Sequence, residues 1–258
     1  MKIAVSGKGG VGKTTVTALV ARRLTQGGKR VLAVDADPNT NLAACLGFPD
    51  PDNIIPIVEM KELIAERMGT IPGAVGAYFK LNPKVSDLPE NFCRESNGLK
   101  LIVMGMVKRG GAGCACPENT FLKALLSHII LDRDETVIVD MEAGLEHLGR
   151  GTTGSMEGLI AVVEPDLRSI DTFERIRRLA ADIGVKNVWC VANRVSEDEE
   201  RAFVRAHVPG DLLLGELPFS KHIIRSSRGQ APLDEAEPAV WEAVDCILRK
   251  IQDRIGSN

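Results

Sequence analysis

The hydrophobic pattern of the chain alternates between short apolar runs and longer amphipathic segments. Runs with the length and β-branched content of buried strands lie at 3–5, 31–34, 99–104, 136–139, 158–163, 188–192 and 212–217. Helix-like apolar spacing is found between them, at 11–26, 39–46, 118–131, 169–183, 197–207 and 238–255. Strands that alternate with helices predict a doubly wound α/β fold with a mostly parallel sheet of about seven strands.

The first apolar run leads directly into a glycine-rich segment, SGKGGVGKTT at 6–15. Gly7, Gly12, Lys13 and Thr14 match G-x-x-x-x-G-K-[ST], the pattern of a phosphate-binding loop. Glycine lets the backbone approach an anion, and the start of the following helix favours negative charge. Lys13 would reach the outer phosphates of ATP or ADP, and the Thr14 hydroxyl would bind Mg²⁺. The expected phosphate-binding residues are Gly9, Gly10, Val11, Gly12, Lys13, Thr14 and Thr15. The alternative is a glycine turn that only joins a strand to a helix.

Carboxylate side chains follow two of the predicted strands. Asp35 and Asp37 come after the strand at 31–34, and Asp140 comes after the strand at 136–139. Open α/β sheets bind ligands at the carboxyl ends of their strands, and such an aspartate commonly holds Mg²⁺ through a water molecule. We therefore expect Asp140 to hold Mg²⁺, with Asp35 and Asp37 beside the phosphates. A cap or a turn is the alternative for each of these aspartates.

The region at 47–98 interrupts the alternation of strands and helices. A helix is expected at 59–68, whereas the stretch at 71–97 is rich in proline, glycine and asparagine, which predicts loops and short turns. A connection of this length is unusual inside a compact domain. We therefore expect an irregular insertion at 47–98 within one domain that spans 1–258. The pattern leaves open whether the insertion contacts the nucleotide, a second copy of the chain or another protein.

Composition and charge narrow the class of protein. The chain has 258 residues and a formal net charge of −3, and it lacks a long basic run, which disfavours nonspecific nucleic-acid binding. No apolar stretch approaches the ~20 residues of a membrane-spanning helix, so no stable membrane insertion is expected. We expect the N-terminus to enter the first strand directly, with no secretory leader. The six cysteines are dispersed apart from one close pair, which favours a reducing, cytoplasmic location over a disulfide framework.

Lys8 lies inside the phosphate-binding loop and gives it the sequence KGGVGKT. This loop resembles the deviant Walker A motif of the MinD/ParA-type ATPases, relatives of nitrogenase iron protein. The resemblance implies that Lys8 reaches across a dimer interface to the partner's nucleotide, and that Asp37 orients the attacking water. It also implies that Asp35 supports Mg²⁺ through water or holds its loop, termed switch I in that family. The implied catalytic set is Lys8, Lys13, Asp37 and Asp140. Without the resemblance, Lys8 is interpreted as a solvated loop lysine.

Two later segments extend the resemblance. Residues 141–144 follow Asp140 and are similar to the family's switch II, whose glycine couples the γ-phosphate to the position of the loop. Asn193 and Arg194 resemble the family's adenine-reading pair, because an asparagine amide offers a donor and an acceptor to the base. Pro218 lies in a segment, LPF, that resembles the loop whose backbone also touches adenine. No kinase-type substrate motif is apparent, so slow ATP hydrolysis used as a switch is expected.

Cys114 and Cys116 form the close cysteine pair. Residues two apart in an extended segment face the same way, so both sulfur atoms are able to reach one ion. Two thiolates fall short of the four ligands that Zn²⁺ and square-planar Ni²⁺ take. A two-fold dimer closed over nucleotide would bring two such pairs together in a shared site of four cysteines. The alternative is a pair of small cysteines buried in a loop.

The deviant loop and the cysteine pair together resemble the CooC-type accessory ATPases, which help to insert nickel into carbon monoxide dehydrogenase, and their relatives that serve acetyl-CoA synthase. The resemblance covers the whole chain and rests on the segments GKGGVGKTT, DADPNTNL, CAC, VDMEAGLEHLGRG, ANR and LPF. It implies a homodimeric metallochaperone that holds Ni²⁺ or Zn²⁺ for a client nickel enzyme. Two alternatives stay open. One is a positioning ATPase that acts on membrane or DNA, and the other is an iron–sulfur electron donor, whose cysteines are widely spaced.

Overall fold

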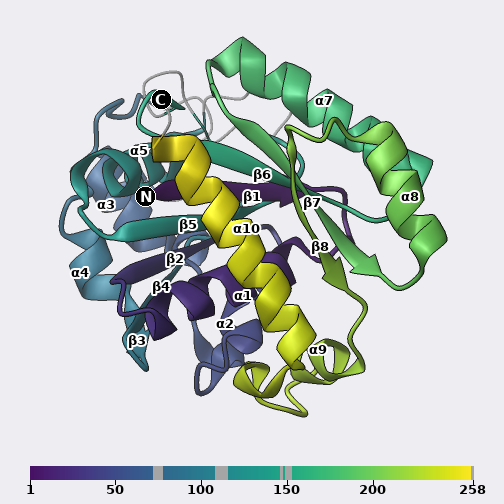
Figure 1. The fold of residues 1–258 in the computed structure, drawn as a ribbon. Helices are drawn as coiled ribbons and strands as arrows, with labels where there is room; N and C mark the ends of the chain where they lie inside the picture. Colours follow the sequence, from purple (N-terminus) through teal and green to yellow (C-terminus); the bar gives the residue numbers. More distant parts are fainter. Residues whose placement is uncertain (72–77, 108–115, 146–147, 149–152, 257–258) are drawn as a thin grey trace.

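The computed structural model describes residues 1–71, 78–107, 116–145, 148 and 153–256 of the chain (Figure 1). The strands are β1 (Lys2–Gly7), β2 (Val31–Ala36), β3 (Arg94–Ser96), β4 (Leu99–Val103), β5 (Thr136–Met141), β6 (Gly158–Val163), β7 (Val188–Val195) and β8 (Leu213–Pro218). The α-helices are α1 (Lys13–Gln26), α2 (Leu42–Cys45), α3 (Lys61–Met68), α4 (Leu88–Phe92), α5 (Pro117–Asp132), α7 (Leu167–Ile183), α8 (Asp198–His207), α9 (Lys221–Ser226) and α10 (Pro238–Gly256). Short 3₁₀ helices are η1 (Pro51–Asn53), η2 (Ile57–Glu59) and η3 (Leu233–Glu235).

The strands form one sheet in the order β3-β4-β2-β5-β1-β6-β7-β8. Neighbouring strands are parallel except for β3, which is antiparallel to β4. β1 lies inside the sheet between β5 and β6, and the chain winds outward from it in both directions. Sheets with this winding bind ligands at the carboxyl ends of the strands, where the direction of winding changes. The predicted doubly wound, mostly parallel α/β fold is confirmed.

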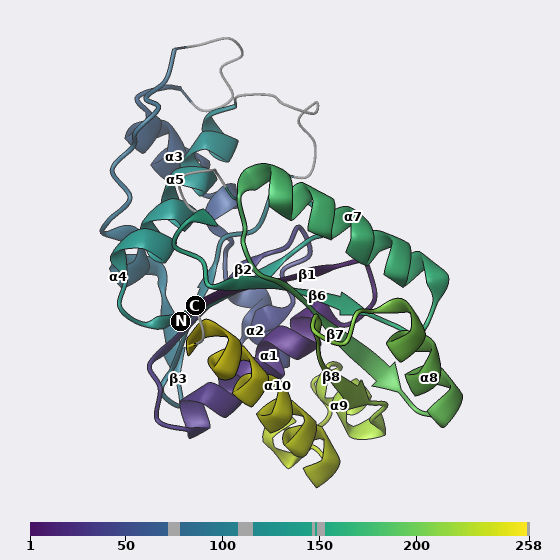
Figure 2. The same cartoon turned by 45° about the horizontal axis from the view of Figure 1, so that its top comes forward.

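Helices cover both faces of this sheet (Figures 1 and 2). On one face, α1 and α10 pack over a core that includes Leu19 and Ile247. On the other face, α5 and α7 pack over a core that includes Phe121 and Phe173. Every residue of β2 and β6 is buried, which explains why these strands are apolar along most of their length instead of alternating with polar residues.

The structure corrects the prediction for 47–98. The strand β3 was not predicted and raises the number of strands in the described part of the chain from seven to eight. Its residues Arg94 and Glu95 are exposed, so no apolar pattern marks it. The helix α4 was not predicted either, and its Leu88 is fully buried in the core. The expectation of loops and short turns at 71–97 is therefore wrong for α4 and β3.

Two further differences concern helix positions. The helix α2 begins at Leu42 and not at residue 39, because the backbone before it is held in turns by aspartate side chains. The helix α9 was not predicted, although the Ser220 hydroxyl caps it by accepting a hydrogen bond from the backbone N–H of Ile223 at 3.0 Å. Across the described ranges, every helix is too short or too polar to span a bilayer.

Candidate functional site

The loop between β1 and α1 has the conformation that its glycines predict. Gly10 and Gly12 adopt left-handed backbone angles, with φ of 89° and 91°. A Cβ atom on Gly12 would lie 2.2 Å from Nδ2 of Asn193, so a side chain is also excluded by its surroundings. Gly12 is the N-terminal cap of α1, and the N–H groups of the first helical turn are directed at the loop. An anion at this position meets these N–H groups and the positive end of the helix dipole.

Lys13 and Asp37 form an ion pair at the inner side of the loop. Nζ of Lys13 lies 3.6 Å from Oδ2 of Asp37, and the two side chains are 8% and 11% exposed. A buried charge is unfavourable without a partner of opposite sign, so each group stabilises the charged form of the other. The structure thus brings together the lysine of the phosphate-binding loop and the carboxylate predicted for switch I. Lys8 is half-buried and precedes the exposed Gly9 and Gly10 on the open side of the loop.

Asp35 is fully buried at the carboxyl end of β2 and fastens the loop that follows. Its Oδ1 accepts a hydrogen bond from the backbone N–H of Asp37 at 3.2 Å, and its Oδ2 accepts one from Leu42 at 2.9 Å. Burial raises the pKa of Asp35 to about 7, the charge of Asp140 adds to this, and the two backbone hydrogen bonds oppose it. Both carboxylate oxygens of Asp35 are therefore engaged in holding the switch I loop.

Asp140 lies beside Asp35, directly across the ladder between β5 and β2. The Thr17 hydroxyl lies 3.5 Å from Oδ1 of Asp140, whereas Oδ2 is buried without a hydrogen-bond partner among the described residues. Burial raises the pKa of Asp140 to about 7, against the effects of the Thr14 hydroxyl and the Lys13 charge. A buried oxygen without a donor is unfavourable, and a water molecule bound to Mg²⁺ would supply the donor. The residues at this position therefore suit Mg²⁺.

The segment after β5 is tied to the phosphate-binding loop by Ser6. The hydroxyl of this buried residue donates a hydrogen bond to the backbone carbonyl of Glu142 at 2.8 Å. The bond fixes the beginning of the segment predicted to be switch II. Ser6 was not among the predicted site residues, although a hydroxyl near the end of a largely apolar strand was the available signal.

Asn193, Arg194 and Pro218 line one small cavity at the carboxyl ends of β7 and β8. Nδ2 of Asn193 donates a hydrogen bond to the carbonyl of Val11 at 2.8 Å, which ties β7 to the phosphate-binding loop. Arg194 has an unusual φ of 59°, and its Nη1 lies 2.6 Å from Oε1 of Glu164. The three residues predicted to contact adenine therefore lie together. The apolar wall of this cavity was not predicted, and it includes Leu217, Phe219, Ile223, Ile224 and Val240.

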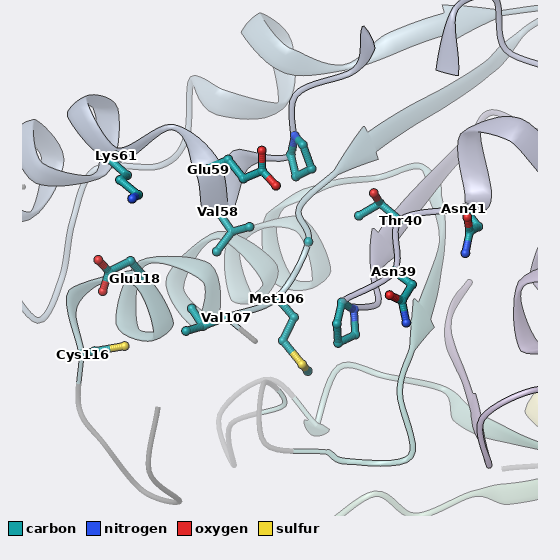
Figure 3. Close-up of a pocket in the computed structure, with 13 residues that line it drawn as sticks. Asn39, Thr40, Asn41, Val58, Glu59, Lys61, Met106, Val107, Cys116 and Glu118 are labelled. Atoms are coloured by element: carbon teal, nitrogen blue, oxygen red, sulfur yellow. The ribbon is translucent and has the colours of Figure 1, made fainter. Parts of the chain in front are cut away.

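Cys116 is the N-terminal cap of α5, and Cys114 lies outside the described residues. Cys116 lines a cavity of about 720 Å³ that is also lined by switch I residues 39–41 and by Met106 (Figure 3). Within the described ranges, no three His, Cys, Asp or Glu side chains are grouped so that they could hold a metal ion. The shared site that includes Cys114 stays a prediction.

The chain matches a family model described as the CobQ/CobB/MinD/ParA nucleotide binding domain over residues 2–233. It is similar to the carbon monoxide dehydrogenase accessory protein CooC of Rhodospirillum rubrum, with 40% identity over 99% of this chain and 98% of that protein. An uncharacterized ATP-binding protein of Methanocaldococcus jannaschii is 41% identical over 94% of each chain. Among solved structures, the MinD cell division protein of Aquifex aeolicus has a TM-score of 0.66 and 23% identity, over 98% of this chain and 97% of that chain.

The likeness to MinD concerns the fold, whereas the family model and the two relatives extend to the sequence of the nucleotide-binding region. The prediction of an ATPase that binds ATP or ADP with Mg²⁺ is confirmed by this membership. The loop from Gly7 to Thr14 and the aspartates at the strand ends lie inside the matched range. The chain therefore belongs to the CobQ/CobB/MinD/ParA family of nucleotide-binding ATPases, in the group that includes the CooC-type accessory proteins.

Proposed function

We propose that this ATPase is a metallochaperone that dimerises on nucleotide binding and holds Ni²⁺ or Zn²⁺ between the Cys114–Cys116 pairs of two chains. Its client is a nickel enzyme such as carbon monoxide dehydrogenase or acetyl-CoA synthase. The observation that carries the proposal is the position of Cys116, which begins α5 and shares a cavity with switch I. The 40% identity to CooC, named as an accessory protein of carbon monoxide dehydrogenase, supports the choice of client.

The position of Cys116 at a helix N-terminus supports metal binding chemically. The positive end of the α5 dipole favours the thiolate, which is the form that binds metal. Cys114 lies two residues earlier in the sequence. One chain supplies two thiolates, and a two-fold dimer supplies the four ligands of a tetrahedral or square-planar site.

Nucleotide binding would replace Asp37 as the partner of Lys13. The two groups form a buried ion pair, and the phosphates of ATP carry negative charge that Lys13 is able to bind instead. The exchange frees Asp37 to hold the attacking water. Thr14 and Asp140, the latter through water, would hold Mg²⁺, which neutralises charge on the phosphates.

The remaining site residues act on the nucleotide itself. The N–H groups of the loop from Gly9 to Thr15 hold the phosphates, and Asn193, Arg194 and Pro218 hold the base. Lys8, on the open side of the loop, reaches the nucleotide of the partner chain. Lys8 thereby makes dimerisation depend on bound triphosphate, and the dimer in turn completes the cysteine site.

The proposal is tested by titrating the full-length protein with Ni²⁺ and Zn²⁺, with and without a non-hydrolysable ATP analogue. One ion per two chains is expected with the analogue, and a Cys114→Ala/Cys116→Ala variant should lose it. The matched control is Cys93→Ala/Cys246→Ala, which removes two half-buried thiols from other parts of the fold. Unchanged stoichiometry and affinity in Cys114→Ala/Cys116→Ala would overturn the proposal.

The same preparations test the two alternative functions. ATP-dependent pelleting with liposomes or DNA would support a positioning ATPase. Visible absorbance after anaerobic purification would support an iron–sulfur electron donor. Absence of nucleic-acid binding and a cytoplasmic location stay predictions.

A further inference from the structure

The cavity beside Cys116 is separate from the nucleotide site and has the size of a binding pocket. Its volume is about 720 Å³, and its walls come from switch I, from η2 and the start of α3, from the segment after β4, and from the start of α5 (Figure 3). Ligand pockets in proteins measure roughly 300–1,000 Å³. Lys13 and Asp140 are not among the described residues that line it.

The lining of the cavity combines an apolar floor with amide groups. Val58 and Met106 are half-buried and form part of the floor, whereas Asn39 and Asn41 are exposed on the switch I side. An asparagine amide donates and accepts hydrogen bonds, which matches the alternating N–H and C=O groups of an extended peptide. An apolar side chain of the same peptide would cover the floor.

The charges around the cavity favour a basic occupant. Among the described residues that line it, Glu59 and Glu118 are acidic and Lys61 is basic. Cys116 also lines the cavity. An anion such as free phosphate or a second nucleotide is disfavoured by this balance, whereas a lysine or arginine side chain is attracted.

We propose that this cavity is a docking site for an extended basic segment of the client polypeptide, with an apolar side chain on the floor and a lysine or arginine at Glu59 and Glu118. That the partner is the metal-accepting client rests on the proposed function. Docking here brings the client next to Cys116, so metal transfer takes place over a short path.

The backbone couples this docking site to switch I. The carbonyl of Asp35 accepts hydrogen bonds from the N–H groups of Met104 and Gly105, at 2.9 and 3.1 Å, while the Asp35 carboxylate holds the switch I loop. The carbonyl of Met104 in turn accepts from the N–H of Val58 at 3.0 Å. The floor of the cavity and the loop that senses nucleotide are therefore fastened to the same residue, and the nucleotide state alters docking.

The test measures binding of short capped peptides with a fluorescent label to the full-length protein by anisotropy. One peptide alternates lysine and leucine, and the other alternates glutamate and leucine. The basic peptide should bind about ten-fold more tightly than the acidic one, and Glu59→Lys should remove that preference. Lys61→Glu should shift affinity for the basic peptide in the opposite direction. Glu62→Lys, an exposed residue of α3 outside the cavity lining, is the matched control and should change little.

The outcomes distinguish failure of the docking site from failure of the proposed function. Metal titration of Glu59→Lys should match the unsubstituted protein, because Glu59 is not a proposed ligand. Equal binding of both peptides, or equal effects of Glu59→Lys and Glu62→Lys, would overturn the docking site while the metal site stands. A change in the nucleotide-dependent mass of Glu59→Lys, with no change in peptide binding, would overturn it in favour of a contact with a second copy.

Discussion

The two sides of the switch I loop differ in how completely one chain builds them. On the nucleotide side, Lys13, Asp35, Asp37 and Asp140 are all buried. Lys13 pairs with Asp37, and Asp35 lies opposite Asp140 on the neighbouring strand. On the cysteine side, the loop borders an open cavity lined by exposed side chains such as Glu59. Buried charged side chains have fixed positions because their partners are part of the fold. Exposed charged side chains become fixed only when a binding partner contacts them. In the proposed cycle, the first side is prepared in each chain and the second is completed by a partner.

Lys13→Ala should have the largest effect, and it should impair only the nucleotide side of the switch I loop. It removes the cation that serves the phosphates and leaves Asp37 buried without its partner. We expect the rate of ATP hydrolysis to fall at least about 100-fold, measured as phosphate release. Lys61→Ala is the control, since this exposed lysine lies on the cysteine side. Comparable loss of activity in both variants would contradict the separation of the two sides.

Gly105→Ala tests the connection between the two sides. Gly105 has a φ of 66°, and a Cβ atom there would lie 2.8 Å from Cγ1 of Val58. Strain and overpacking together should lower the free energy of unfolding by about 1–3 kcal/mol, measured by denaturant titration. Gly28→Ala is the matched control, because Gly28 also has a positive φ, of 77°, but its Cβ would meet open space. A smaller loss in Gly105→Ala than in Gly28→Ala would show that the wall of the cavity yields easily.

The pH dependence of stability should be traced in part to Glu135, far from both sides of the loop. Its hydrogen bonds to Arg133 lower the pKa of Glu135 from 4.5 to about 2. A pKa that is lower in the folded state stabilises the fold above pH 4.5, and this contribution is lost as the pH falls from 4.5 towards 2. Glu135→Gln should therefore flatten the acid limb of the stability curve, measured by thermal unfolding from pH 7 downward. An unchanged curve, identical to that of the exposed control Glu235→Gln, would refute this assignment.

Glu174→Gln should have the smallest effect. Glu174 pairs with Arg177 one turn further along α7, at 2.8 Å, and both side chains are more than a third exposed. Such helix-surface pairs contribute about 0.3–0.5 kcal/mol, so the shift in unfolding free energy should be near the limit of detection. A loss above ~1 kcal/mol would mean that the surface of α7 is more constrained than its exposure indicates.

The sequence predicts the nucleotide side because its chemistry depends on local motifs. Asp35 and Asp140 follow continuous apolar runs, and the parallel sheet then sets them side by side. The bond from Ser6 to Glu142 and the buried contact of Leu88 depend on residues far apart in the chain, which no local pattern shows. The helix α4 was missed for the same reason. The strand β3 pairs with its neighbour in the chain, β4, and was missed because its exposed residues show no apolar pattern.

On the cysteine side, the sequence predicted only the two cysteine ligands and not their surroundings. Their spacing predicts that the side chains of Cys114 and Cys116 point the same way. It does not predict that Cys116 caps α5 or that it lines a cavity with Asn39 and Glu59. These residues come from segments separated by a long stretch of chain, and the fold alone brings them together. The periodicity of apolar residues identifies helices and strands. Predicting a cavity between them also requires their relative positions in space.

The central claim is that bound triphosphate joins two chains and thereby makes one metal site from two cysteine pairs. Light scattering with parallel metal analysis tests it most directly, using an Asp37→Asn variant to block turnover under saturating ATP and Ni²⁺. The account predicts the mass of two chains and one ion for each pair of chains. Single chains at working concentrations, or a full complement of metal in each single chain, would contradict it.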